Sequence, residues 1–211
     1  MSECRLIVVR HGETEWNREG RIQGYYADSP LTGHGRAQAE AVAVRLAREG
    51  IDRIYCSDLG RTCETAAPIA RATGVDVVRD PELRERSYGI LEGRTFAEIA
   101  TEYPEMYERI RSRDPEYAVE RGESAVQFSA RIVAAMERIA AASPGKRVAV
   151  VTHGGVVGTL YRHAKAIPLD APRTYSLTNA SCSHFRYGAG RWEIDLWCDV
   201  SHLPAAALDD T

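Results

Sequence analysis

The sequence predicts an α/β domain in which helices cover both faces of a mostly parallel sheet. Unbroken apolar runs at residues 6–9 and 148–151 are typical of strands that are buried on both faces. Stretches with helical spacing of apolar residues follow such runs, which is the alternation that parallel sheets require. Because the 211 residues show no internal repeat, linker or change in composition, we expect one domain over residues 1–211.

The first half of the chain should supply three strands and two helices. The opening strand stops at Arg10-His11-Gly12, and residues 12–34 are rich in Gly, Asn, Asp, Ser and Pro. They predict a long loop, of the kind that carries function in compact domains. Gly50 and Gly74 should end the two helices. We expect strands at residues 6–9, 51–56 and 75–79, and helices at residues 33–49 and 61–73.

The second half opens with an excursion at about residues 86–122. Short helices at 95–99 and 105–111, separated at Pro104, indicate a cap over one edge of the site. The tail from about residue 204 should be disordered. Between these segments we expect a long helix to about residue 142, a strand at 147–152, a helix at 156–163, and an edge hairpin at 183–187 and 192–197.

The composition argues against several classes of function. The chain has 27 Lys and Arg residues against 30 Asp and Glu residues, a net charge of -3, so nothing indicates a nucleic-acid or membrane surface. The five cysteines form no C-x-x-C pair, no H-E-x-x-H pattern occurs, and no signal peptide precedes the first strand. We therefore expect a cytoplasmic protein with reduced thiols, without bound zinc and without a membrane span.

Two apolar runs that are far apart in the sequence both end in a His-Gly pair. His11-Gly12 follows the first strand, and His153-Gly154 follows the strand at 147–152. Since ligands bind at the carboxyl ends of strands in open α/β sheets, we expect both imidazoles in one site. Arg10 precedes His11, and Arg61 should lie at a helix N-terminus, where free amides favour an anion. Two guanidiniums and two imidazoles around one small volume indicate a dianionic phosphoryl ligand.

One histidine must then be the nucleophile, because no Cys or Ser lies in an activating motif. A neutral imidazole can attack phosphorus and form a phosphohistidine, and the neighbouring arginines favour a neutral His11 by lowering its pKa. The leaving alcohol needs a proton. Glu85, in the loop after the third strand, is the best candidate to donate it, with Glu13 and Glu82 as alternatives.

Four ordered motifs carry a resemblance to a known family. RHGETEWN at 10–17, SDLGRT at 57–62, ELRE at 82–85 and THGG at 152–155 resemble the histidine phosphatase superfamily, in its phosphoglycerate mutase-like branch. The resemblance implies a three-layer α/β/α fold, no metal or cofactor, and catalysis by a phosphorylated His11 with Glu85 and His153. It also implies phosphate binding by Arg10, His11, Asn17, Arg61 and His153, and substrate contacts from Gln23, Gly24 and Gly154.

The family divides between phosphatases and mutases. The segment LEGRTFAEIATEYPEMYERI at 91–110, followed by RGES, resembles the phosphatase type, which has a short cap with few basic side chains. We therefore expect a phosphomonoesterase that hydrolyses small phosphorylated metabolites, either as a monomer or as a homodimer. Arg111 and Arg113 could contact a second anionic group, so a phosphoglycerate mutase is the alternative. A non-catalytic module that binds a phosphorylated ligand is the third hypothesis.

Overall fold

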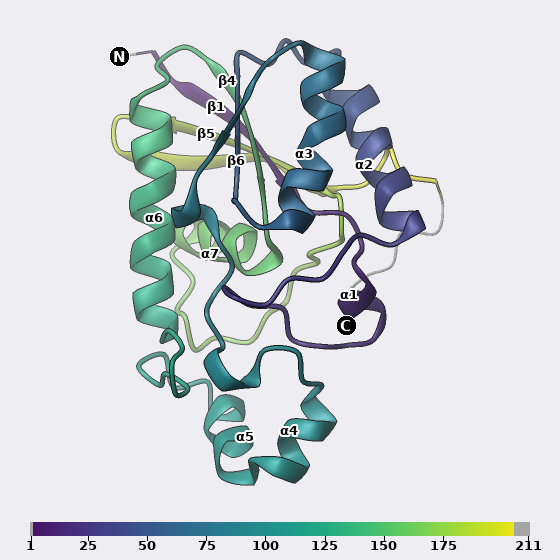
Figure 1. Ribbon diagram of the computed structural model, residues 1–211. Coiled ribbons are helices and arrows are strands. Elements are labelled where there is room, and N and C mark those ends of the chain that lie inside the picture. The colour runs from purple at the N-terminus through teal and green to yellow at the C-terminus, as the bar shows by residue number, and fades with distance from the viewer. Residues whose placement is uncertain (1, 205–211) are drawn as a thin grey trace.

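The computed structural model describes residues 2–204 and contains a six-stranded sheet. The strands lie in the order β3-β2-β4-β1-β5-β6 across it (Figure 1). Neighbours from β3 to β1 pair in parallel, and β5 and β6 add an antiparallel hairpin at one side. The predicted mostly parallel sheet is therefore confirmed. The strands are β1 (Cys4–Arg10), β2 (Arg53–Cys56), β3 (Val77–Arg79), β4 (Arg147–Thr152), β5 (Cys182–Gly188) and β6 (Arg191–Asp199).

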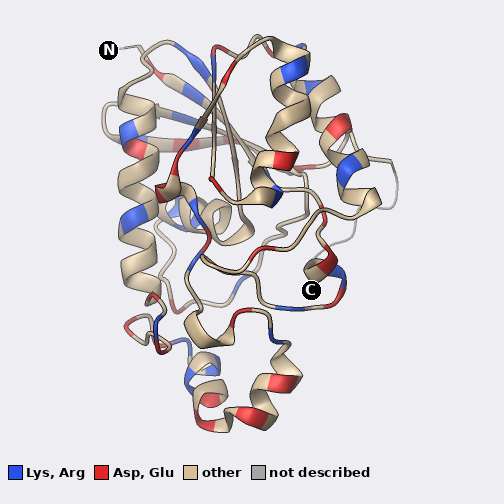
Figure 2. Cartoon of the chain, in the orientation of Figure 1, with Lys and Arg blue, Asp and Glu red and all other residues tan. Residues whose placement is uncertain are grey.

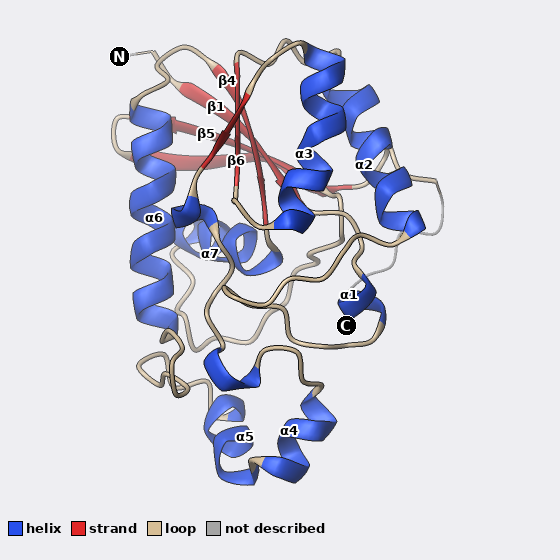
Figure 3. Ribbon diagram, in the orientation of Figure 1, coloured by secondary structure: helices blue, strands red, loops and turns tan. Residues whose placement is uncertain are grey.

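Helices cover both faces of the sheet, so the fold has the three layers that were expected. α2 and α3 pack on one face, and α6 and α7 pack on the other (Figure 3). Alternate residues of β1 serve the two faces: Leu6 and Val8 join one buried cluster, and Ile7 and Val9 join the other. The helices are α1 (Glu15–Arg18), α2 (Gly33–Leu46), α3 (Gly60–Thr73), α4 (Phe96–Glu102), α5 (Pro104–Arg111), α6 (Ala125–Ala141) and α7 (Gly154–Lys165).

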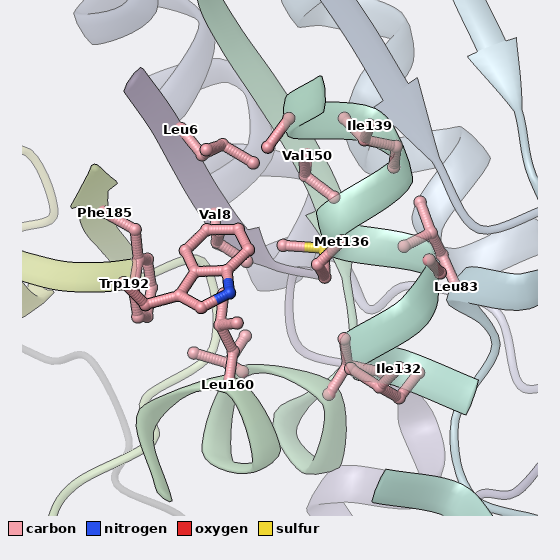
Figure 4. Close-up of a cluster of buried hydrophobic side chains, with 14 of the residues drawn as sticks. Leu6, Val8, Leu83, Ile132, Met136, Ile139, Val150, Leu160, Phe185 and Trp192 are labelled. Carbon is pink, nitrogen blue, oxygen red and sulfur yellow. The ribbon is translucent and has the colours of Figure 1, made fainter. Parts of the chain in front are cut away.

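The core between α6, α7 and the sheet is drawn in Figure 4. Ile132, Met136 and Ile139 recur at helical spacing along α6 and belong to one buried cluster with Val8 of β1 and Leu160 of α7. Burying each such side chain contributes about 1.5–3 kcal/mol. The cluster therefore holds α7, which follows β4 directly, in a fixed position against the strand ends.

Capping residues set the helix limits much as expected. Thr32 caps α2, Ser124 forms a capping box before α6, and Gly74, with a left-handed φ of 71°, ends α3. Three elements are shorter than predicted. α2 ends at Leu46 because the chain turns over residues 47–50, β2 begins at Arg53, and β3 begins at Val77.

The cap (residues 86–122) extends beyond the sheet as α4 and α5, the lowest helices in Figure 1. These two helices pack mainly on each other. Leu91, Ile99 and Val119 form a small buried cluster there, separate from the two clusters of the sheet. α4 contains acidic residues, and α5 contains both acidic and basic residues (Figure 2). The cap is thus joined to the sheet mainly by loops.

Between residues 2 and 204 the structure contains no helix that is long and apolar enough to cross a lipid bilayer. The expectation of a disordered tail falls almost wholly on residues 205–211, which lie outside the described residues.

Candidate active site

The ends of β1 and β4 lie side by side and bring the two His-Gly pairs together. Arg10 is in register with Thr152, and the His11 N–H donates to the Thr152 carbonyl over 2.9 Å. The ring centroids of His11 and His153 are 5.4 Å apart, in an edge-to-face arrangement. Two residues that are 142 positions apart in the sequence therefore share one site, because their strands are neighbours in the sheet.

The His11 ring is buried, and one of its nitrogens contacts the backbone. Nδ1 lies 2.8 Å from the Gly12 carbonyl oxygen. A carbonyl can only accept, so Nδ1 carries the proton and Nε2 keeps its lone pair. Burial, and then the charges of Arg61 and Arg10, hold the pKa of His11 well below its usual value. The neutral tautomer that a nucleophile requires is the one this environment favours.

His153 lies at the N-cap of α7 and is fully buried. Its Nδ1 accepts a hydrogen bond from Nε of Arg61 over 3.2 Å. Its Nε2 therefore carries the proton and lies 2.9 Å from the hydroxyl oxygen of Ser57, at the end of β2. Burial and the nearby Arg61 lower the pKa of His153 well below its usual value. Both imidazoles are accordingly neutral hydrogen-bonding groups.

Arg10 and Arg61 are buried beside the two histidines. Arg10 donates to the Leu177 carbonyl. The Arg61 guanidinium lies at the start of α3, as predicted, and forms an ion pair with Asp28 over 2.8 Å. Burial lowers the pKa of Arg61, and the charge and hydrogen bond of Asp28 oppose that shift. Two cations thus lie within one largely dehydrated region, where an anion would be bound strongly.

Glu85 is bound at the first turn of α7. One carboxylate oxygen accepts from the Gly155 N–H and the other from the Arg86 N–H, each over 2.7 Å. Burial raises the pKa of Glu85, although these two amides oppose the rise. Of the alternatives, Glu13 accepts a hydrogen bond from the Thr32 hydroxyl over 2.7 Å, and Glu82 is exposed. Glu85 is the carboxyl group whose environment best suits a proton donor.

A cavity of about 700 Å³ opens onto these groups. Gly24 and His153 do not line this cavity among the described residues, and each of them contacts Arg61 instead. Asn17 uses its Oδ1 to accept from Thr14 and leaves its amide nitrogen as the group that could reach a ligand. The predicted site residues that do line the cavity are Arg10, His11, Asn17, Gln23, Arg61, Glu85 and Gly154.

Three contacting residues were not predicted from the sequence. Ser57 contacts His153, Asp28 pairs with Arg61, and Asn179 donates from its Nδ2 to the His11 carbonyl over 3.0 Å. Ser57 follows a strand directly, so the rule that places ligands at strand ends could have identified it. Asp28 and Asn179 lie in irregular segments without any periodic signal. Residues 2–204 contain no group of three or more His, Cys, Asp and Glu side chains that could hold a metal ion.

Known proteins match almost the entire chain. Residues 6–200 match the model of the histidine phosphatase superfamily (branch 1). A relative from Proteus mirabilis, named probable phosphoglycerate mutase GpmB, is 40% identical over 98% of both chains. YhfR of Bacillus stearothermophilus superposes with a TM-score of 0.86 at 34% identity, over 94% of this chain and 98% of that one. A mycobacterial glucosyl-3-phosphoglycerate phosphatase, solved with VO3, gives a TM-score of 0.79 at 31% identity, over 92% of this chain and 98% of that one.

Proposed function

The chain belongs to the histidine phosphatase superfamily, branch 1, and from that premise we propose that it is a phosphomonoesterase of small phosphorylated metabolites. The observation that carries the proposal is the His11 ring, whose Nδ1 is bound to the Gly12 carbonyl and whose Nε2 keeps its lone pair beside two arginines. We further propose that the enzyme acts in the cytoplasm.

In the first step, Nε2 of His11 attacks the phosphorus of the bound ester in line with the leaving oxygen. Arg10 and Arg61 bind the phosphoryl oxygens and stabilise the charge that develops on them. The new bond joins nitrogen to phosphorus, and the bond from phosphorus to the ester oxygen breaks. Glu85 gives its proton to that oxygen, so the substrate leaves as a neutral alcohol.

In the second step, water attacks the phosphohistidine on the same phosphorus. The Glu85 carboxylate, which lost its proton in the first step, now takes one from the attacking water. The bond from nitrogen to phosphorus breaks and returns its electron pair to His11. Inorganic phosphate is released, and Glu85 is again protonated for the next cycle.

Two observations support hydrolysis over transfer to a second hydroxyl. Arg111 and Arg113 do not line the cavity among the described residues, and Arg111 pairs with Glu108 on the surface of α5. The cap therefore lacks the basic clamp that would hold a second anionic group through those two residues. A cavity of about 700 Å³ also leaves room for an alcohol larger than a three-carbon acid. One similar structure bears the name of a phosphatase for such a larger substrate.

A phosphoglycerate mutase is the second candidate, because a relative at 40% identity carries that name. The cavity is lined by five arginines besides Arg10 and Arg61, namely Arg18, Arg21, Arg86, Arg162 and Arg173. A mutase could use such cations to retain a phosphorylated intermediate while the second hydroxyl moves into place.

The two candidates are separated by product analysis. We expect the enzyme to release inorganic phosphate from an aryl phosphate and from a panel of sugar phosphates, phosphoglycerates and nucleotides. With 3-phosphoglycerate, with or without 2,3-bisphosphoglycerate, we expect slow phosphate release and no rapid formation of 2-phosphoglycerate. Rapid interconversion of 2- and 3-phosphoglycerate with negligible free phosphate would establish the mutase instead.

A further inference from the structure

Glu92, at the base of the cap, binds a row of three backbone amides outside the cap and one amide within it. Its Oε2 accepts from the N–H groups of Tyr26 and Ala27, over 3.0 and 2.7 Å. Its Oε1 accepts from Tyr25 and from Tyr88, over 3.0 and 3.1 Å. Three consecutive amides that face one carboxylate form a concave anion site, and hydrogen bonds to a charged acceptor are stronger than neutral ones. Glu92 therefore fixes the course of the 24–28 loop.

The same loop supplies most of the acceptors for Arg61. The guanidinium donates to the Gly24 carbonyl over 3.1 Å, to the Ala27 carbonyl over 3.3 Å and to the Asp28 carboxylate over 2.8 Å. With the bond from Nε to His153, four of the five N–H groups that a guanidinium offers are used within the protein. The direction of the remaining N–H is then determined by where the loop lies.

The contact between Glu92 and the loop is close. A β-carbon built on Gly24 would lie 2.1 Å from Oε1 of Glu92, so only glycine lets the loop approach the carboxylate in this way. On the far side of the loop, the second oxygen of Asp28 accepts from the Gly60 N–H over 2.5 Å, at the start of α3. The loop is thus held between the cap and the helix that carries Arg61.

We propose that Glu92 is a positioning residue for Arg61. Its carboxylate fixes the 24–28 loop, and the loop aims the guanidinium at the phosphoryl group. The proposal rests on the proposed function, since it concerns the arginine that binds the phosphoryl oxygens. It assigns to the base of the cap a part in phosphate binding that does not involve contact with substrate.

The first test compares carboxylate and amide at this position. In Glu92→Gln, an NH2 group replaces one acceptor oxygen and meets backbone N–H donors, so the loop should shift. Misplacing a binding group by about 1 Å can cost about 100-fold in rate, and we expect kcat/KM for an aryl phosphate to fall about 10- to 100-fold. Inhibition by inorganic phosphate should weaken in parallel. Asp52→Asn is the matched control, because Asp52 also accepts a backbone N–H, from Arg147 over 2.8 Å, but neither it nor its partners Arg147 and Lys146 line the cavity.

A double-mutant cycle with Arg61 separates positioning from general support of the fold. In an Arg61→Ala background, Glu92→Gln should reduce kcat/KM no further, because the group that it positions is gone. Equal losses of activity in the two backgrounds, or full activity of Glu92→Gln, would overturn the proposal.

Two further outcomes are distinguishable. If Glu92→Gln does not fold, Asp28→Asn replaces it in the same cycle, since Asp28 is the link between the loop and the guanidinium, and additive losses would again overturn the proposal. If Arg61→Ala alone retains full activity, the proposed phosphoryl site is wrong, and the proposal fails with it. Loss of activity in Arg61→Ala together with an inert Glu92→Gln would leave the proposed function standing and refute only the role of Glu92.

Discussion

The carboxyl ends of the strands, where His11 lies, and the cap beside them are stabilised in different ways. At the sheet edge, His11, Arg61, Glu85 and His153 are all buried and bonded to backbone or to each other. The cap has a small apolar cluster around Ile99, and its two helices carry several charged residues. At the strand ends nearly every polar group is held by hydrogen bonds. The cap is held mainly by contacts within the cap itself.

The difference indicates how the two regions divide their work. Reacting groups need fixed positions, which neighbouring strands and the first turn of α7 provide. Tyr88 and Phe96 of the cap line the cavity, so under the proposed function the cap would meet differently shaped alcohols and need less rigid support. Loops that carry specificity are usually the more variable part of a domain. Substitutions in the two regions should therefore differ both in what they change and in how much.

Replacing the proposed nucleophile should abolish turnover. We expect His11→Ala to lower kcat by about 10⁴-fold or more, because no other described side chain in the cavity offers a neutral nitrogen in that position. Rapid quenching with a radiolabelled phosphate ester should show a labelled enzyme for the wild type and none for the variant. A variant that still turned over at the wild-type rate would show that His11 is not the nucleophile.

Replacing the acid should depend on the leaving group. Glu85→Gln is expected to lower kcat/KM by about 10²- to 10⁴-fold for an alkyl phosphate, and much less for a dinitrophenyl phosphate, whose leaving oxygen needs no proton. An equal loss for both substrates would argue that Glu85 acts only in binding.

The pH profile should change in the same variant. Burial raises the pKa of Glu85, so the wild-type rate should fall as the pH rises through that value and the acid is lost. On the acid side, His11 stays neutral to a lower pH than an ordinary histidine, because its pKa is depressed. The profile of kcat/KM should therefore be bell-shaped, and Glu85→Gln should remove the fall on the alkaline side.

Matched core substitutions should compare the two regions directly. Ile132 in α6 and Ile99 in α4 are both fully buried. Ile132→Ala should lower the free energy of unfolding by about 2–5 kcal/mol. Ile99→Ala should shift global unfolding less, because α4 packs mainly on α5, while it increases proteolysis within residues 86–122. Denaturant unfolding and limited proteolysis measure the two effects. Equal effects on global unfolding would show that the cap and the sheet unfold together.

The smallest effect is expected on the surface of α5. Arg111 is exposed and pairs with Glu108 one turn earlier. Arg111→Ala should change the free energy of unfolding by no more than about 0.5 kcal/mol and leave KM for aryl phosphates unaltered. Arg111 is one of the two residues that could contact a second anionic group in a mutase. A large rise in KM for 3-phosphoglycerate alone would therefore support the mutase.

The site residues that can be predicted from topology alone share one property: they follow a strand or begin a helix. His11, His153 and Arg61 stand at such points, so the topology of an α/β sheet was enough to bring them together. Glu85 is the best candidate on position but competes there with Glu13 and Glu82, and the family resemblance adds the evidence that separates it from them. Asp28 and Glu92 could not be identified, since their role depends on how two loops meet. Such contacts arise from tertiary structure and produce no periodic pattern in the sequence.

Gly155, at the start of α7, determines how easily such an enzyme could lose its catalytic activity by mutation. A β-carbon on Gly155 would lie 2.1 Å from a carboxylate oxygen of Glu85. The obstructed atom is the end of a flexible side chain, so Gly155→Ala would displace the acid at little cost to the fold. A single added methyl group could thus leave a stable protein that still recognises phosphate esters without cleaving them. Evolution could reach a pseudoenzyme from this scaffold in one codon change, with its recognition surface inherited intact.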